Sequence, residues 1–189
     1  MSKLYALFDF ELNQKHKKSL EEFVGLCKRL DAKVIQYRDK VNSFEVKKQN
    51  LIMIRELWDK TLLINDEVDL SQFCDGIHLG QEDLAKIHHD KKKALIMIRD
   101  IVDDKIVGLS THNKDEILEA NNLDIDYIGL GAYRKTSTKK DIQGILGDDI
   151  KTLCNFSKKP VAVIGGVKVD DSIEFASYKV VGSDLYLYY

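Results

Sequence analysis

The chain has 189 residues, 44% of them hydrophobic, with 31 acidic and 29 basic side chains and a formal net charge of -2. This length predicts a single globular domain over residues 1–189. Because neither sign of charge dominates, the composition gives no general case for nucleic acid or an anionic membrane as a partner.

No apolar run is long enough to cross a bilayer, and residues 1–10 lack the basic start and long apolar core of a secretion signal. The cysteines, Cys27, Cys74 and Cys154, are odd in number and far apart, without a Cys-x-x-Cys pair. We interpret all three as buried reduced thiols rather than zinc ligands or a redox dithiol. The sequence therefore predicts a soluble, cytoplasmic protein.

Short β-type runs alternate with helical patterns along the chain. Residues 19–30 and 113–120 carry apolar side chains at helical spacing, the second behind Asn113 as the expected N-cap. Several strand-like runs are almost wholly apolar, as expected when both faces of a parallel sheet are covered by helices. In chain order the runs are LYALFD, KVIQYR, LLIN, GIHL, KIVGLS, DYIGLG, PVAVIGG and DLYLYY.

Eight strand–helix units in one domain predict an α/β fold, a (β/α)8 TIM barrel. The chain is short for this fold, which typically takes ~250 residues. The unit from Thr61 to Leu79 has room for only about two helical turns, and with DLYLYY as the eighth strand the barrel lacks its last helix. A doubly wound open sheet is the rival architecture.

Two carboxylates follow neighbouring strands of this predicted barrel, Asp66 after LLIN and Asp83 after IHLGQE. If both runs are parallel strands, both acids lie at the same rim. They repel each other unless a cation lies between them, and a hard divalent ion held by one or two acids usually also holds phosphates. This stretch predicts a magnesium-phosphate site.

The second strand ends in a cationic stretch, where alternation places Gln36, Arg38 and Lys40 on one face. Two cations and an amide suit a polyanionic ligand that carries a heterocycle, although a solvated loop explains the stretch equally well. After the sixth and seventh strands come two weaker candidates for phosphate binding. They are the hydroxyl and lysine run from Thr136 to Lys140 and the pair Gly165-Gly166.

A family resemblance follows from these motifs taken together. In the same order, from Val34 to Val167, the chain resembles thiamine phosphate synthase through QYRDK, LLINDEVDL, DGIHLGQEDL, IVGLSTH, DYIGLGAYRKTSTKKD and PVAVIGGV. The combination of QxRxK, IND, HxGQxD and TxTKKD is specific, although non-synthase relatives of the family share part of it. The resemblance implies a transferase that joins a pyrimidine methyl pyrophosphate to a thiazole phosphate through a C–N bond, releasing pyrophosphate.

The resemblance also implies roles for individual residues, with Mg²⁺ as the cofactor and small molecules as substrates. The metal ligands would be Asp66 and Asp83. The catalytic residues would be Arg38, Lys40, Ser110 and Lys139. The substrate-binding residues would be Gln36, Tyr37, Asp39, Asn65, Thr136, Ser137, Thr138 and Gly166.

The chain departs from the family pattern in two places. Ala132, Tyr133, Arg134 and Lys135 replace a Gly-Pro-apolar-apolar-Pro segment. With DLYLYY as the last strand, the chain ends before the Ser-Ala-Ile turn of the thiazole phosphate site, and apolar surface beside the first and last strands would need a partner subunit, such as a second copy in a homo-oligomer. An alternative register makes YKVV the last strand and Gly182-Ser183 the phosphate turn; we favour the first.

Two other functions are compatible with the motifs. A thiazole tautomerase shares the barrel and phosphate site, but its catalytic histidine would stand where this chain has Ala132. A non-catalytic barrel would bind a thiamine precursor or a protein partner. His78 and His112 lie near strand ends, and we expect His112 to order its loop rather than act as a base.

Overall fold

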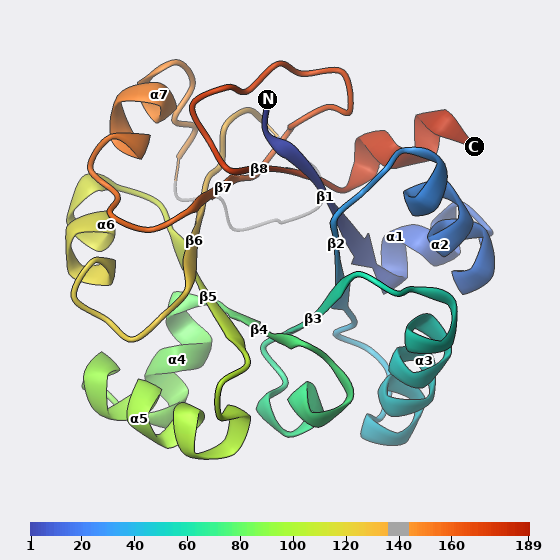
Figure 1. The fold of residues 1–189 in the computed structure, drawn as a ribbon, viewed down its shortest axis with the longest axis horizontal. Helices are drawn as coiled ribbons and strands as arrows, with labels where there is room; N and C mark the ends of the chain where they lie inside the picture. The colour runs from blue at the N-terminus through green and yellow to red at the C-terminus, as the bar shows by residue number, and fades with distance from the viewer. Residues whose placement is uncertain (136–143) are drawn as a thin grey trace.

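A closed barrel of parallel strands forms the centre of the molecule (Figure 1). The structure is a computed structural model that describes residues 1–135 and 144–189. Within these residues each strand pairs with the next, and the last closes the ring against the first. Closure confirms the barrel and excludes the open sheet, which would leave two unpaired edges. The strands are β1 (Lys3–Asp9), β2 (Val34–Arg38), β3 (Thr61–Asn65), β4 (Gly76–Leu79), β5 (Ile106–Thr111), β6 (Tyr127–Leu130), β7 (Val161–Val163) and β8 (Tyr178–Val181).

Helices surround the ring of strands, as Figure 1 shows. Between β3 and β4 only two short turns of 3₁₀-helix fit, as the length of that unit predicts. The helical elements are α1 (Phe10–Lys15), α2 (Leu20–Arg29), α3 (Phe44–Leu57), η1 (Val68–Phe73), α4 (Gln81–Ile87), α5 (Lys91–Val102), α6 (Lys114–Ala120), α7 (Asp149–Cys154) and η2 (Ser183–Tyr188).

Both helices predicted from spacing are confirmed, with their caps. Ser19 begins α2 with a capping box, because its hydroxyl accepts from Glu22 N while the Glu22 carboxylate accepts from Ser19 N. The Asn113 side chain accepts from Glu116 N at 2.9 Å and caps α6. These local hydrogen bonds explain why the boundaries could be read from the sequence.

Strand side chains alternate between two apolar layers. One layer lies between the strands and the helices and includes Phe8, Ile35 and Tyr37. The other fills the barrel interior and includes Leu7, Leu63 and Val180. The interior layer closes the middle of the barrel, so functional side chains gather at its rim.

The eighth strand is YKVV and not DLYLYY, so our favoured register is wrong. Tyr178–Val181 pairs with both β7 and β1, while Ser183–Tyr188 forms the 3₁₀-helix η2. The apolar alternation of DLYLYY resembles a strand, but the barrel position beside β1 is already taken by YKVV. Gly182-Ser183 therefore follows the last strand at the same rim as the other strand ends.

The helix η2 covers the surface that a missing last helix would expose. Leu185 and Tyr186 are buried, and the Tyr186 hydroxyl donates to Asn13 Oδ1 of α1 at 3.1 Å. Figure 1 shows this C-terminal helix beside α1 and α2. This face therefore needs no partner subunit to cover it, and a homo-oligomer stays a prediction.

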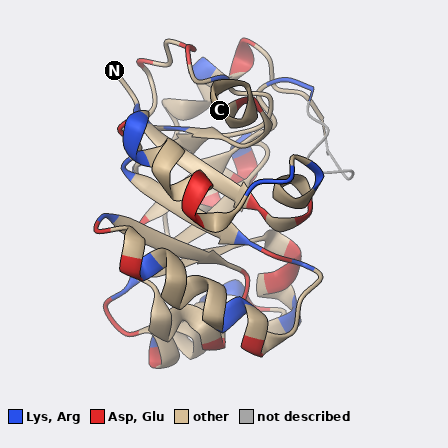
Figure 2. Ribbon diagram, turned by 90° about the vertical axis from the view of Figure 1, so that its right-hand side faces the viewer, with Lys and Arg blue, Asp and Glu red and all other residues tan. Residues whose placement is uncertain are grey.

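Charges of both signs are interspersed along the visible helices in Figure 2, in agreement with the near balance of acids and bases. In the described part of the chain, no helix is long and apolar enough to cross a membrane. Cys27, Cys74 and Cys154 are unpaired and buried, as predicted. Burial raises the pKa of the Cys74 thiol to about 12 and that of Cys154 to about 11.

Candidate active site

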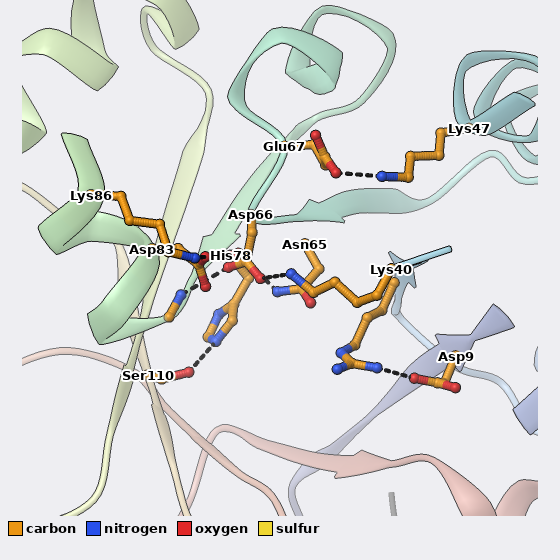
Figure 3. Close-up of polar contacts among 12 residues, drawn as sticks. Asp9, Lys40, Lys47, Asn65, Asp66, Glu67, His78, Asp83, Lys86 and Ser110 are labelled. Atoms are coloured by element: carbon orange, nitrogen blue, oxygen red, sulfur yellow. Dashed lines mark hydrogen bonds and ion pairs between the residues drawn. The ribbon is translucent and has the colours of Figure 1, made fainter. Parts of the chain in front are cut away.

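Asp66 and Asp83 converge at the C-terminal rim of the barrel (Figure 3). Asp66 follows β3 with a left-handed backbone, φ 64°, which aspartate tolerates better than most residues. Its Oδ1 accepts from Gly80 N at 2.9 Å. A Cβ atom added at Gly80 would lie 2.9 Å from Asp83 Oδ2 and 3.8 Å from Asp66 Oδ1. Both carboxylates therefore reach the same small space beside Gly80.

Two lysines balance the charge of this pair. Lys40 Nζ lies 2.5 Å from Asp66 Oδ2, and Lys86 Nζ lies 2.7 Å from Asp83 Oδ1. Burial raises the pKa of Asp66, although Lys40 opposes this effect. Burial also acts to raise the pKa of Asp83, but Lys86 and Lys40 outweigh it, so that pKa is lowered. The two acids thus experience different environments at one site.

The donor set fits Mg²⁺. Among residues 1–135 and 144–189, no group of three or more histidine, cysteine or acidic side chains is arranged to hold a metal. Mg²⁺ does not need such a group, because it is commonly held by one or two carboxylates and takes its other oxygen ligands from phosphates and water. Two carboxylates at an open rim match that requirement.

Arg38 and Gln36 share the inward face of β2, as the alternation predicts. Arg38 forms an ion pair with Asp9, a buried carboxylate at the end of β1 that also caps α1 by accepting from Leu12 N at 3.0 Å. Gln36 lies one layer deeper and donates to the Tyr5 hydroxyl. Arg38 and Lys40 are therefore the cations that β2 and its following loop bring to the rim.

Tyr37 lies on the opposite face of β2, and Asp39 directly follows the strand. The Tyr37 ring stacks on Phe8, and its hydroxyl donates to Asp39 Oδ2 at 2.7 Å. Asp39 also accepts from Val41 N and Asn42 N, which orders the loop after the strand. Substrate binding by Tyr37 and Asp39 stays a prediction, and the contacts of their side chains are structural ones.

Asn65 and Ser110 stand on either side of His78 at the ends of β3, β4 and β5. The Asn65 amide donates to the His78 carbonyl at 3.2 Å, and Ser110 Oγ lies 3.0 Å from His78 Nε2 (Figure 3). Gln81 donates to the Ser110 carbonyl at 2.6 Å. This group holds Ser110 beside His78 and Gln81 at the rim end of β5.

Sequence reasoning missed Asp9 and Lys86, which hold the site together, and it placed His78 near a strand end without giving it a role. Asp9 and His78 are polar residues at the ends of apolar strands, a signal that was present in LYALFD and GIHL. Lys86 lies three positions after Asp83, which is the spacing of neighbours on one helix face.

The loops after β6, β7 and β8 meet at the same rim. Gly165 and Gly166 adopt φ values of 90° and 65°, and a Cβ at Gly166 would lie 2.8 Å from Arg134 Cβ. Arg134 pairs with Asp171 at 2.6 Å and so joins the loop after β6 to the loop after β7. Close packing at this junction explains the need for glycine at Gly166.

Four predicted residues lie outside the described part of the chain. They are Thr136, Ser137, Thr138 and Lys139, and their predicted roles stay predictions.

The chain is similar to known proteins over nearly all of its length. It is 31% identical over 184 residues to a thiamine-phosphate synthase of Ruminiclostridium cellulolyticum, covering 95% of this chain and 83% of that protein. It is 33% identical to a thiamine-phosphate synthase of Clostridium acetobutylicum, covering 90% of this chain and 78% of that protein.

A solved structure and a family model agree with these relatives. The thiamine phosphate pyrophosphorylase of Pyrococcus furiosus superposes with a TM-score of 0.72 at 25% identity, covering 98% of this chain and 91% of that one. The family model described as thiamine monophosphate synthase matches residues 4–183. With this match and the barrel rim described above, the chain belongs to the thiamine monophosphate synthase family.

Proposed function

We propose that the chain is a thiamine phosphate synthase, which joins a pyrimidine methyl pyrophosphate to a thiazole phosphate and releases pyrophosphate. The observation that carries the proposal is the convergence of Asp66 and Asp83 beside Gly80, with Lys40 paired to Asp66. Such an arrangement suits a magnesium pyrophosphate, and the relatives named thiamine-phosphate synthase support the specific reaction.

Charge determines the chemistry of the first step. The C–O bond to pyrophosphate breaks with its electron pair on the leaving oxygen, so the added negative charge must be neutralised. Arg38 and Lys40 supply positive charge at the rim, and Lys139 would add a third cation. Held by Asp66 and Asp83, Mg²⁺ would neutralise further charge on the pyrophosphate.

In the second step the protein mainly positions the two substrates. The electron-rich aminopyrimidine delocalises the positive charge on its methylene carbon, and the thiazole nitrogen donates its lone pair to form the C–N bond. Holding both substrates in line contributes several kcal/mol, on the order of 7 to 11 in favourable intramolecular models. We assign the thiazole phosphate to the Gly166 backbone and to Gly182-Ser183, together with Thr136 and Thr138.

Compartment and partners belong to the same proposal. We place the enzyme in the cytoplasm, since its three buried unpaired cysteines suit a reducing compartment. Its partners would be the two small-molecule substrates, without nucleic acid or membrane.

Mass spectrometry tests the reaction directly. The full chain is mixed with both substrates and Mg²⁺, and thiamine phosphate is quantified against an EDTA control. We expect metal-dependent product. A folded protein that makes none, beside an active known synthase, would contradict the proposal and turn attention to the tautomerase, which is assayed by aromatisation of the thiazole alone.

A matched pair of variants locates the pyrophosphate. Arg38→Gln removes the cation at the rim and should raise KM for the pyrimidine pyrophosphate or lower kcat by roughly 10-fold or more. Arg29→Gln removes an exposed cation at the end of α2 and should leave both constants unchanged. Equal kinetics for the two variants would remove Arg38 from the mechanism.

A further inference from the structure

A chain of hydrogen bonds crosses the barrel interior from β2 to β5. Gln36 Nε2 donates to Tyr5 Oη, and Tyr5 Oη lies 3.0 Å from Tyr127 Oη. Tyr127 Oη lies 2.8 Å from His78 Nδ1, and His78 Nε2 lies 3.0 Å from Ser110 Oγ. Figure 3 shows this last link at the rim, where it meets the carboxylate site.

Two glycines make room for the rings of this chain. A Cβ added at Gly108 would lie 2.2 Å from Tyr127 Cζ, and one added at Gly129 would lie 2.9 Å from His78 Cε1. Gly108 stands on β5, which pairs with the Tyr127 strand β6. Gly129 stands on β6, which is separated from the His78 strand β4 by β5. The backbone is therefore shaped to hold a tyrosine and a histidine where barrels usually place branched apolar residues.

The direction that gives each buried hydroxyl of this hydrogen-bond chain an acceptor runs from Gln36 to Ser110. The Gln36 amide nitrogen can only donate, so Tyr5 Oη accepts from it, and Tyr127 Oη is the acceptor placed to receive a hydrogen bond from the buried Tyr5 hydroxyl. Tyr127 then donates to His78 Nδ1, which leaves the proton of the neutral imidazole on Nε2. Burial raises the pKa of both tyrosines far above the ordinary value, so both hydroxyls keep their protons.

The hydrogen-bond chain ends at the Ser110 hydroxyl and fixes the direction of its proton. When His78 Nε2–H donates to Ser110 Oγ, the serine proton points away from the imidazole. We propose that His78 is a positioning residue, which with Tyr127 and Tyr5 holds the Ser110 hydroxyl as a donor to an acceptor atom of the pyrimidine pyrophosphate. The identity of the ligand in this inference rests on the proposed function. The direction of the hydrogen-bond chain is argued from the contacts above alone.

Nitrogen NMR of the unliganded protein tests the orientation without any turnover. Protein labelled with ¹⁵N-histidine reports which ring nitrogen carries the proton, and the signal that disappears in His78→Gln belongs to His78. We expect the Nε2–H tautomer in the wild type and a loss of that preference in Tyr127→Phe. An Nδ1–H tautomer would mean that the chain runs in the opposite direction and would overturn the proposal.

A double-mutant cycle tests whether His78 acts through Ser110. His78→Leu should lower kcat about 10- to 100-fold with little change in KM, the range seen when the outer partner of a functional group is removed. His78→Gln, whose amide nitrogen can replace Nε2, should recover part of that loss. In the Ser110→Ala background, His78→Leu should add less than about threefold, because the two changes share one effect. Losses that multiply fully would overturn the proposal.

A matched pair of tyrosine variants distinguishes loss of the hydrogen bond from a general effect on packing. Tyr127→Phe removes a hydroxyl of the chain, whereas Tyr178→Phe removes one from the ring that packs edge-on against Tyr5 in the same interior. We expect slower turnover only for Tyr127→Phe, and equal losses would contradict the proposal. If the wild type makes no thiamine phosphate, the assignment of the ligand falls with the proposed function, while the NMR result still decides the orientation.

Discussion

At the scale of the residue, the buried position of the Asp66 carboxylate is unfavourable for its charge and suited to binding a cation. Its carboxylate is mostly buried and lies beside a second acid, so the ionised form is disfavoured until a cation compensates for it. In this structure Lys40 supplies the compensation. A bound divalent ion would take over that role and release the lysine for the pyrophosphate.

Replacing either acid should remove the Mg²⁺-dependent turnover. Asp66→Asn and Asp83→Asn each remove a charged oxygen ligand, and we expect turnover at limiting Mg²⁺ to fall by at least about 100-fold. The control is Asp69→Asn, an exposed acid on η1. Titration of Mg²⁺ against the rate of thiamine phosphate formation measures the effect. Normal turnover by both variants would show that the metal assignment is wrong.

The raised pKa of Asp66 predicts a pH dependence of the metal-free protein, measured in EDTA. Because burial raises this pKa in the folded state, the folded protein binds the proton more tightly than the unfolded chain does. The wild type should therefore lose stability relative to Asp66→Asn as the pH rises above the ordinary aspartate pKa of about 4. Thermal unfolding of both proteins between pH 4 and 8 (about one measurement per pH unit) tests this sign, and a constant difference would contradict it.

Single site residues could be predicted where the residues that they act with lie nearby in the sequence. Asp66 and Asp83 were predicted because each follows an apolar run, and parallel strands bring such ends together. His78 and Asp9 also lie near the ends of apolar runs, but the residues that they contact are not nearby in the sequence. Their partners, Ser110 and Arg38, are distant along the chain and meet them only through closure of the barrel.

At the scale of the element, the interior of β5 depends on a glycine. Gly108 faces the Tyr127 ring, so an added methyl group would overlap it at 2.2 Å. Such overlap forces the ring or the strand to move and costs about 1–3 kcal/mol or more.

A glycine-to-alanine substitution should change the free energy of unfolding in opposite directions in β5 and in α2. Gly108→Ala should lower the free energy of unfolding by at least about 1–3 kcal/mol. Gly25→Ala should raise it by about 0.5–1 kcal/mol, because Gly25 lies in α2 with only Arg29 Nη1 nearby, at 3.9 Å. Urea unfolding measures both values. A neutral Gly108→Ala would show that the interior has room that the structure does not indicate.

Element type was predicted well where capping and periodicity were local, as in α2 and α6. It was wrong at the C-terminus, where YKVV and DLYLYY both have strand-like patterns. Strand pairing is decided by neighbours in space, and only one segment can lie between β7 and β1. The pattern of either segment alone could not make that choice.

At the scale of the whole molecule, η2 covers the barrel beside β1 and β8. Leu185 is fully buried, whereas Leu187 is 78% exposed. Leu185→Ala should therefore lower the free energy of unfolding by about 2–5 kcal/mol, and Leu187→Ala should change it by less than about 0.5 kcal/mol. Thermal or urea unfolding checks this contrast, and similar values would mean that η2 does not pack as described.

By itself, the sequence determined the alternation of strands and helices, the caps of two helices and the two acids that follow β3 and β4. These features depend on neighbours within about a dozen residues, which is the range over which spacing and capping act. Only the tertiary structure decided which segment is β8, and which face of the barrel η2 covers. It also joined Gln36, Tyr5, Tyr127, His78 and Ser110 into one chain, because those contacts exist only after the parallel strands close into a ring.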